Sequence, residues 1–278
     1  MLYLGFGQAA RLHAEFVQSS AKTDSHDDLF ATTRDITNKQ GLIKDLQVAL
    51  LDIADHCAIE MAADGQKVLV SLPPDAPEQD RLAALVSRRK ALIYLSSTGV
   101  YGTNGRKEID LETPPLADNP QAEARLAAEA IWLAAGAVIL RLPGLYDRQN
   151  NVVSRILQGK YRIPGDGSNY VSRIHLEDLA RIIDLSFALP PGQIWLVGDQ
   201  CPATHLEIAS YVCKEIGIDL PDFAPLDEVH YTMRSDRRVD GRALLDKLGY
   251  RLIYPDFRAG LKEAISSKNA SFVDKKWE

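Results

Sequence analysis

The stretch MLYLGFGQAA, residues 1–10, places an apolar run directly before a glycine-rich turn and an amphipathic segment. Its Gly5-x-Gly7-x-x-Ala10 spacing is typical of dinucleotide-binding turns, although a Gly-x-Gly turn can also arise for steric reasons alone. The first glycine permits a tight turn, the second lets a pyrophosphate approach the backbone, and the small third residue lets the helix pack closely. Because the amides that open the helix then face the phosphates, we expect Gly5, Gly7, Gln8 and Ala10 to bind a dinucleotide.

Apolar runs and helical segments alternate along the chain. Most of the runs are continuously apolar, which is typical of strands buried on both faces of a parallel sheet. The predicted strands are residues 1–7, 28–34, 46–52, 67–73, 91–97, 137–143 and 193–199. The predicted helices between them include residues 77–89 and 119–136, the second opened by Asn119 and Pro120. The sequence therefore predicts an α/β fold with a doubly wound parallel (Rossmann) sheet.

The pattern changes after residue 145, where short segments replace the regular alternation. Residues 202–218 read as a helix with a capping box formed by Thr204 and Glu207. We expect a dinucleotide-binding Rossmann domain over residues 1–145. A smaller C-terminal substrate lobe over residues 146–278 is expected to be partly interleaved with it, sharing the strand near 193–199.

Composition excludes several classes of protein. The net charge of −6 and the lack of a basic run argue against nucleic-acid binding. The three cysteines form no C-x-x-C pair and the six histidines show no ligand spacing, so neither disulfides nor a metal site is expected. The longest apolar run, residues 130–140, is too short to span a bilayer. We expect a cytoplasmic protein that acts on a small-molecule substrate and has no membrane partner. A homodimer is possible.

The end of the second predicted strand selects the nucleotide. A carboxylate there favours NAD, and an arginine favours the 2′-phosphate of NADP. The tip reads Thr33-Arg34-Asp35, so a hydroxyl and a guanidinium favour NADP while Asp35 keeps NAD open. Asp24, Asp27 and Asp28 precede the apolar run and are expected at the wrong end of the strand. Asp52, which closes the third run, is either a contact for the adenine edge or an ordinary loop carboxylate.

A set of motifs in this order resembles the extended short-chain dehydrogenase/reductase family, in its NAD-dependent epimerase/dehydratase branch. The set comprises the G-x-G-x-x-A turn, VLVSLPP (68–74), YLSSTGVYG (94–102), a helix containing Ala-Glu, RLPGLY (141–146), RIHLEDLA (173–180) and LDKLGYRLIYPDFRAGL (245–261). The resemblance implies NAD(P) bound at the carboxyl edge of the sheet, with Pro73 among the cofactor-binding residues. It also implies a sugar nucleotide or similar small substrate held by the second lobe.

The family's active site carries over only in part. Its catalytic hydroxyl falls on Ser97, with Thr98 beside it and Tyr101 as a nearby phenol; Tyr101 is alternatively a packing residue. The family's Tyr-x-x-x-Lys falls on Gln121 and Arg125, and no tyrosine of the chain has a lysine four residues on. A glutamine amide is not a general acid or base, but Arg125 can still hold the nicotinamide ribose. The resemblance is therefore to an atypical member.

Three further residues are expected to meet the substrate, namely Arg141, Tyr146 and Arg173, while His175 is at least as well explained by a role between the lobes. Two functions remain open. The first is an NAD(P)-dependent oxidoreductase or epimerase that polarises a carbonyl with Ser97 and uses another proton donor. The alternative is a non-catalytic NADP-binding protein with a regulatory or structural role. The intact Ser97–Thr98 turn favours the enzyme, and the missing phenol favours the alternative.

Overall fold

The computed structural model describes residues 1–20, 28–34, 46–102 and 108–274, with side-chain surroundings up to residue 266. The chain divides into two compact units, each assembled from separated segments. Unit 1 consists of Met1–Val100, Ala117–Arg141 and Leu176–Trp195. Unit 2 consists of Tyr101–Leu116, Leu142–His175 and Leu196–Glu278. Each unit therefore draws on both halves of the sequence.

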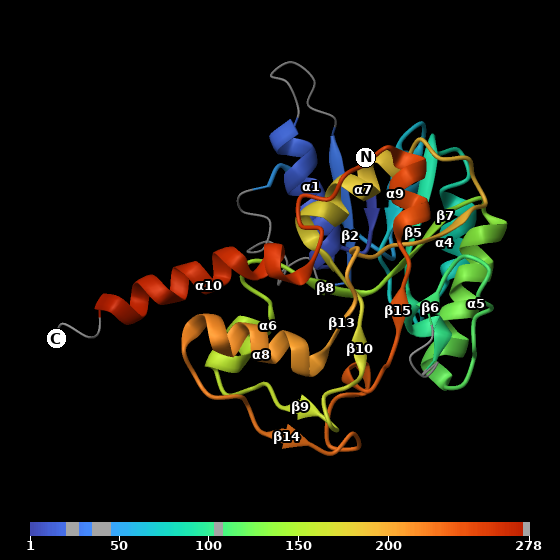
Figure 1. The fold of residues 1–278 in the computed structure, drawn as a ribbon. Helices are drawn as coiled ribbons and strands as arrows, with labels where there is room; N and C mark the ends of the chain where they lie inside the picture. Colours follow the sequence, from blue (N-terminus) through green and yellow to red (C-terminus); the bar gives the residue numbers. More distant parts are fainter. Residues whose placement is uncertain (21–27, 35–45, 103–107, 275–278) are drawn as a thin grey trace. The chain divides into compact units, whose positions relative to one another are not determined.

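The central sheet has seven strands in the order β12-β7-β5-β4-β1-β2-β3 (Figure 1). Their bounds are β1 (Leu2–Leu4), β2 (Leu29–Thr33), β3 (Val48–Asp52), β4 (Lys67–Val70), β5 (Ala91–Ser97), β7 (Val138–Leu142) and β12 (Ile194–Leu196). Leu2 pairs in parallel with Phe30 on one side and with Val68 on the other. Each predicted strand lies in this sheet, and the doubly wound parallel α/β fold is confirmed.

The strand order reverses at β1. From there the chain proceeds through β2 and β3 toward one edge, and through β4, β5, β7 and β12 toward the other. Such a switch point opens a crevice beyond the carboxyl ends of the strands, because the connections leave in opposite directions. The residues that follow β1 and β4 therefore flank the place where a ligand is expected in a sheet of this kind.

The helices of unit 1 bury apolar faces against the sheet. They are α1 (Gln8–Ser20), α3 (His56–Ala63), α4 (Gln79–Leu85), α5 (Pro120–Ala134) and α7 (Leu176–Ser186). Helix α5 begins as predicted, with the Asn119 side chain accepting from the amide of Ala122 at 2.9 Å and Pro120 in the first turn. Trp132 of α5 is fully buried and stacks on Tyr94 of β5, with ring centroids 6.1 Å apart. This stacking fixes α5 over the strand that carries Ser97.

Unit 2 is built from helices and short strand pairs. Its elements are β6 (Glu108–Ile109), β8 (Gly144–Tyr146), α6 (Val152–Leu157), β9 (Ile163–Pro164), β10 (Tyr170–Val171), β11 (Arg173–His175), β13 (Ala203–Thr204), α8 (His205–Ile216), β14 (Phe223–Ala224), η3 (Tyr231–Met233), β15 (Arg238–Val239), α9 (Arg242–Leu248) and α10 (Phe257–Asp274). Strands β8 and β11 are parallel, as are β9 and β14, whereas β10 and β13 are antiparallel. The predicted capping box of α8 is present, formed by Thr204 and Glu207.

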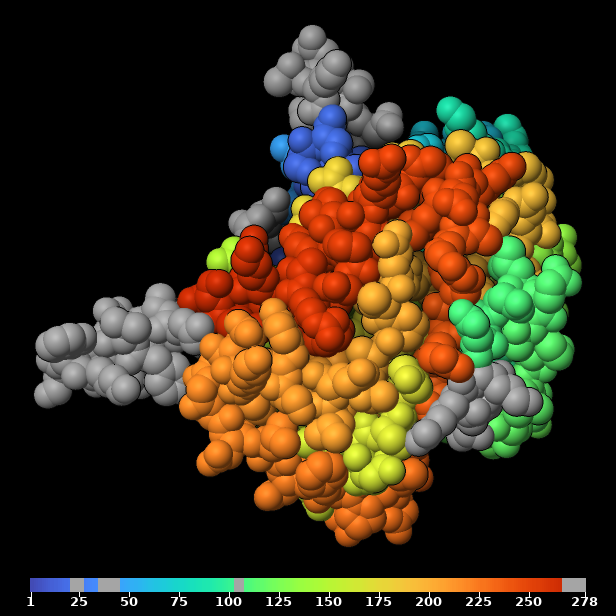
Figure 2. Space-filling view, in the orientation of Figure 1, coloured from blue at the N-terminus to red at the C-terminus, as the bar shows by residue number. Residues whose placement is uncertain are grey.

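Helices α6, α8 and α10 enclose the apolar core of unit 2. Val153, Ile208, Val212 and Leu261 are each at most 1% exposed in this core. Figure 2 shows the segments after residue 196, coloured orange, packed around the yellow-green segment near residues 160–170. The core of unit 2 therefore joins segments that are far apart in the sequence.

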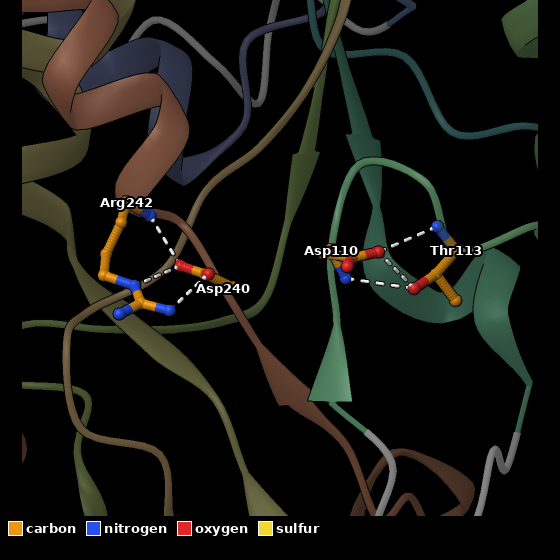
Figure 3. Close-up of polar contacts among 4 residues, drawn as sticks. All are labelled: Asp110, Thr113, Asp240 and Arg242. Atoms are coloured by element: carbon orange, nitrogen blue, oxygen red, sulfur yellow. Dashed lines mark hydrogen bonds and ion pairs between the residues drawn. The ribbon is translucent and has the colours of Figure 1, made fainter.

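Strands β6 and β15 pair in parallel within unit 2, and each ends in a carboxylate turn. Asp110 accepts from the amide and the hydroxyl of Thr113, and Asp240 makes a two-point contact with the guanidinium of Arg242 (Figure 3). These hydrogen bonds stabilise the ionised forms and lower the pKa of both carboxyls. Beyond β15 the backbone of Gly241 crosses that of Gly198 so closely that a Cβ on Gly241 would lie 2.6 Å from the Gly198 nitrogen.

We expect Gly241→Ala to lower the free energy of unfolding by about 1–3 kcal/mol, because the added methyl group overpacks backbone against backbone. Gly198→Ala is the matched control from the same crossing, since its Cβ would come no closer than 3.4 Å to any atom outside its own chain neighbours. We expect that control to stay within about 0.5 kcal/mol of the wild type. Chemical denaturation of both variants measures the difference in their free energies of unfolding. Equal stabilities would contradict the close approach of the Gly241 and Gly198 backbones.

Candidate functional site

The turn after β1 is held by hydrogen bonds to two neighbouring strands. The Gly5 amide donates to Thr32 Oγ1 at 2.9 Å, and Ser71 Oγ donates to the Gly5 carbonyl at 2.9 Å. Gly5 has a φ of +81°, and a Cβ there would lie 3.1 Å from Leu72 Cδ2 and 3.2 Å from the Ser71 backbone. Both the backbone conformation and the close approach of β4 therefore require glycine at this position.

The rest of the turn fits a dinucleotide pyrophosphate. The Gly7 carbonyl accepts from the Arg11 amide at 2.9 Å as α1 begins. A Cβ on Gly7 would meet nothing within 4 Å, so the packing of the protein itself does not explain this glycine. Ala10 is fully buried, which lets α1 lie close to the sheet. A phosphate that approached Gly7 and the amides around Gln8 would account for the spacing.

A cavity of about 180 Å³ lies beside the predicted nucleotide-selecting tip. It is lined by Arg34, Ile53, Ala54, His56, Leu72, Pro73, Ala76, Pro77, Glu78 and Leu82. Arg34 is exposed and directly follows β2, and Pro73 lies after β4, so two residues predicted to bind the cofactor share one cavity. Its apolar residues suit a purine ring and Arg34 suits a phosphate beside that ring, while the acidic residue of the lining, Glu78, lies against His56.

The carboxylates considered for nucleotide selection have different positions. Asp52 is exposed, and its Oδ1 accepts from the Ala54 amide at 2.9 Å, which makes it a turn carboxylate next to the cavity. Asp28 precedes β2, at the end of the strand away from Arg34, as predicted. Asp24, Asp27 and Asp35 lie outside the residues that the structure describes. Thr33 ends β2 and is buried.

Sequence reasoning missed the buried amide that fixes the Pro73 loop. Gln79 is 5% exposed, donates to the Pro74 carbonyl at 2.7 Å, and accepts from Trp132 Nε1 at 2.8 Å. Glu78 before it has a left-handed backbone with a φ of 57°, and its carboxylate lies 3.3 Å from His56 Nε2. The Gln79 contacts tie the loop after Pro73 to α5, and the Glu78 contact joins two residues of the cavity lining; no short sequence spacing predicts either.

The predicted catalytic turn follows β5 as a 3-10 helix, η2 (Thr98–Tyr101). Ser97 is partly exposed, and its Oγ accepts from the Gly99 amide at 3.0 Å. Because the oxygen accepts in this contact, its hydrogen remains to be donated to another group. Thr98 is 5% exposed and Tyr101 only 1%. The accessible hydroxyl of this turn is therefore that of Ser97, while Tyr101 has the burial of a packing residue.

Helix α5 presents a charged face to β5. Arg125 donates to the Tyr94 hydroxyl at 3.1 Å, and Glu129, one turn later, accepts from Ser96 Oγ. Tyr94 is completely buried, and that burial raises its pKa, so this phenol positions Arg125 and is not itself accessible to a substrate. Gln121, a further turn toward the start of α5, is exposed.

Arg141, predicted to bind substrate, is instead occupied inside unit 1. Its guanidinium donates from Nε and Nη2 to the two carboxylate oxygens of Glu129, at 3.0 and 2.8 Å. Arg141 and Glu129 are 6% and 4% exposed. A paired and buried arginine of this kind favours a structural role over ligand binding, because removing its partner contact would leave a buried charge.

In unit 2, the predicted substrate residues Tyr146 and Arg173 lie on adjacent strands. β8 and β11 pair with Tyr146 opposite His175 and Gly144 opposite Arg173. The Tyr146 and His175 rings meet edge to face at 5.1 Å, and His175 lies 3.9 Å from the Tyr254 ring. Tyr146 is buried and packs so tightly on α10 that only glycine fits at position 260, whereas Arg173 is partly exposed.

Two buried histidines are held by tyrosines. The Tyr3 hydroxyl lies 3.0 Å from His13 Nδ1 in unit 1, and the Tyr161 hydroxyl lies 2.9 Å from His205 Nδ1 in unit 2. Burial lowers the pKa of each histidine to about 4, because the charged imidazolium loses its hydration. For His205 the positive charge of Arg173 acts in the same direction. Both rings are therefore neutral in the folded protein near pH 7.

The described residues limit other kinds of site. Within them, no group of three or more His, Cys, Asp or Glu side chains could hold a metal ion. None of the helices that could be examined in the described ranges is long and apolar enough to cross a membrane.

The sheet order and the strand–glycine–helix turn together define a Rossmann-fold protein. The profile of the NAD dependent epimerase/dehydratase family matches residues 18–198. The chain belongs to the NAD-dependent epimerase/dehydratase family, as the motif order predicted.

Known proteins resemble the chain to different extents. It is 28% identical to Protein YeeZ of Escherichia coli (strain K12) over 182 residues, which is 63% of this chain and 62% of that relative's length. A functionally unknown conserved protein from Silicibacter pomeroyi has a TM-score of 0.81, with 26% identity over 96% of this chain and 98% of that one. The dTDP-glucose 4,6-dehydratase of Bacillus anthracis, in complex with NAD, has a TM-score of 0.77 with 19% identity, covering 98% and 97% of the two chains. The last similarity concerns the fold alone.

The buried histidines predict an acid-sensitive fold. The unfolded chain takes up protons near pH 6.5 while the folded protein resists until about pH 4, so stability falls as the pH drops through that window. Between pH 7 and pH 4.5 each ring should cost about 2.5 kcal/mol of unfolding free energy. His13→Gln and His205→Gln should each shrink the loss measured by denaturant titration at the two pH values. His230→Gln, at an exposed position, is the control and should leave the loss unchanged.

Proposed function

We propose that the protein binds NADP(H) in preference to NAD(H) and acts as an oxidoreductase or epimerase on a small carbonyl compound or nucleotide sugar. Family membership and the NAD-bound dehydratase of the same fold support a nicotinamide cofactor. Bound at the carboxyl edge of the sheet, this cofactor would supply hydride transfer. The residues proposed to hold it are Gly5, Gly7, Gln8, Ala10, Thr33, Arg34, Asp52, Pro73 and Arg125.

The observation that carries the proposal is the cavity lined by Arg34. Its apolar side, including Ile53 and Leu72, suits an adenine ring, and the guanidinium of Arg34 lies at the tip of β2 where the adenosine ribose is expected. A guanidinium binds a phosphate through paired, charge-assisted hydrogen bonds, which a ribose hydroxyl cannot match. The 2′-phosphate of NADP is therefore the group that best explains Arg34 at this position.

Ser97 is the proposed catalytic hydroxyl, with Thr98 and Tyr101 as neighbours in the same turn. The Gly99 amide donates to Ser97 Oγ and so orients it, which leaves the hydroxyl hydrogen available for a substrate oxygen. A donor fixed in this way stabilises negative charge that develops on a carbonyl oxygen without having to reorganise. Arg125 adds a positive charge on the α5 face that contacts β5.

The alternative is a non-catalytic NADP-binding protein, and one contact favours it. At the family's tyrosine and lysine positions stand Gln121, which cannot exchange a proton, and Arg125, whose Nη1 is bonded to the buried phenol of Tyr94. A phenol is therefore present near Arg125 but is enclosed in the core. The enzyme reading needs a proton donor other than Tyr94.

The assembly and location of the protein stay predictions from the sequence. A homodimer and a cytoplasmic location therefore remain proposals, and Cys57, Cys201 and Cys213, all of which the structure describes, form no disulfide.

Arg34→Ala should weaken NADP(H) binding by about 1.5–3 kcal/mol, because a charge-assisted phosphate contact is lost, and should leave NAD(H) binding nearly unchanged. Calorimetric titration with both cofactors measures the ratio. Arg88→Ala is the matched control, since Arg88 is an exposed arginine of unit 1 that pairs with Asp64. An unchanged NADP(H) to NAD(H) ratio in Arg34→Ala would show that Arg34 does not read the phosphate.

Comparing Ser97→Ala with Gln121→Ala tests whether Ser97 is a catalytic hydrogen-bond donor and whether Gln121 only contributes to binding. Once turnover has been found by screening carbonyl compounds and nucleotide sugars with NADPH, Ser97→Ala should lower kcat on the order of a hundredfold. Gln121→Ala should change KM while leaving the shape of the pH–rate profile intact, because an amide carries no proton in this range. If the wild type is inactive and a Gln121→Tyr, Arg125→Lys double variant turns over, the non-catalytic reading is the correct one.

A further inference from the structure

A second cavity of unit 1, of about 280 Å³, lies at the amino ends of the strands. Its lining comes from the loop before β5, from the first residues of β5 and β7, and from the segment after α7. Strands β1, β4 and β5 are parallel, so these amino ends lie at the opposite edge of the sheet from the turn at Gly5. Because a strand rises about 3.3 Å per residue, Ala91 at the cavity is about 20 Å from Ser97 at the other end of β5.

Arg89 is held at this cavity by the ends of two helices. Its Nη1 donates to the Val86 carbonyl at 2.9 Å, and its Nη2 donates to the Ala135 carbonyl. Val86 and Ala135 are the residues that end α4 and α5. Carbonyls at a helix end carry only part of a negative charge, so they orient the guanidinium without neutralising it. Of its N–H groups, only these donate to a described residue, and the others remain available to a ligand.

The lining carries positive charge without a carboxylate. Lys90, which precedes β5, is exposed and forms no ion pair with a described residue. None of the residues that line the cavity is acidic. The carboxylates of the adjoining segments are paired elsewhere, since Asp64 contacts Arg88 at 3.0 Å and Asp184 contacts Lys67 at 3.2 Å. An anion is therefore the group that would balance the charge of this cavity.

Apolar side chains form much of the remaining lining. Leu92, Val138 and Phe187 belong to it and are each at most 9% exposed. Pockets that hold drug-sized molecules have volumes of about 300–1,000 Å³, so this cavity suits a smaller molecule and is too small for a dinucleotide. The lining thus fits a ligand that has both a charged group and a small apolar body.

We propose that this cavity binds a small organic anion. The carboxylate or phosphate of that ligand contacts Arg89 and Lys90, which hold it by charge-assisted hydrogen bonds. Its apolar body, no larger than one ring, packs on Leu92 and Phe187. Neither the glycine turn nor Ser97 takes part, so this is a second ligand site of unit 1, separate from the one proposed for the cofactor.

Four probes separate the contributions of charge and apolar surface. Benzoate and phenyl phosphate carry both, and the better binder of the two identifies the anionic group. Benzamide keeps the ring without the charge, and inorganic phosphate keeps the charge without the ring. We expect benzamide to bind at least about tenfold more weakly than benzoate, because a charge-assisted contact is lost. Inorganic phosphate should bind at least about tenfold more weakly than phenyl phosphate, because no apolar surface is buried.

The binding is measured by nitrogen-15 NMR titration at constant ionic strength and neutral pH. The Gly136 amide is the reporter, because a Cβ at Gly136 would lie only 3.4 Å from Arg89 Nη2 and its backbone therefore adjoins the guanidinium. The Gly99 amide, which donates to Ser97 Oγ, reports on the proposed catalytic turn. Comparing the two amides distinguishes binding in this cavity from binding at the other edge of the sheet.

Arg89→Gln should weaken binding of the preferred probe at least about tenfold. Lys90→Gln should weaken it about two- to fivefold, and it preserves the test if the Arg89 variant does not fold, since Lys90 is exposed. Arg88→Gln is the matched control, because Arg88 is an adjacent exposed arginine that pairs with Asp64 and does not line the cavity. We expect this control to bind the probe like the wild type.

The proposal is overturned if no probe shifts the Gly136 amide at millimolar concentrations, or if benzamide binds as well as benzoate. It is also overturned if Lys90→Gln binds the preferred probe no more weakly than Arg88→Gln does. Shifts at Gly99 without shifts at Gly136 would place the anion at the catalytic turn and would equally remove the second site. Because no probe is a cofactor and none needs turnover, these results do not depend on the proposed function.

Discussion

The arrangement of unit 1 at the carboxyl ends of β1, β2 and β4 depends on the hydrogen-bonded turn at Gly5. Its amide is bonded to Thr32 of β2 and its carbonyl to Ser71 after β4, so one residue links the carboxyl ends of three adjacent strands. The left-handed backbone turns the chain away from the sheet at the point where the strand order reverses. α1 then begins within reach of that crevice, and the cavity beside Arg34 is bounded by the residues that follow the neighbouring strands. A side chain at Gly5 would disturb all of these elements together.

The arginines differ in their structural roles, and the residue that each guanidinium contacts determines its role. Arg141 is neutralised by Glu129 and braces β7 against α5. Arg125 is held by a phenol, which orients it without cancelling its charge. Arg34 is exposed at the tip of β2, and its side chain has no carboxylate contact among the described residues.

The sequence was sufficient for the fold because the signals involved are local. Continuous apolar runs predicted the strands, and Asn119 with Pro120, like Thr204 with Glu207, predicted where helices begin. The contacts that build the site walls are not local. Trp132 meets Gln79 across 53 positions, and Ser96 meets Glu129 across 33. No spacing rule reaches that far, so the sequence assigned Arg141 to a substrate when the structure pairs it with Glu129.

The functional roles of the predicted site residues are a separate matter from the fold and from the contacts that build the site. The structure brings Arg34 and Pro73 to one cavity and leaves Ser97 accessible, which the motifs of a single chain could suggest but not demonstrate. For Ser97 the decisive information is its partial exposure and the hydrogen bond from the Gly99 amide. Both are properties of the folded surroundings, and a sequence pattern does not contain them.

The interleaving of the two units has a consequence for the order of events during synthesis. Unit 1 requires Leu176–Trp195, so its first hundred residues must wait while the ribosome makes the whole of residues 101–175. At about 5–20 residues per second that delay is on the order of 4–15 s. Until β7 has been made at residue 142, the first strands form a sheet in which β5 is an unpaired apolar edge, and β7 is then the edge until β12 is made at residue 196. The nascent chain is therefore a client for any chaperone that shields strand edges, and a messenger with slow codons over residues 101–175 would prolong its exposure.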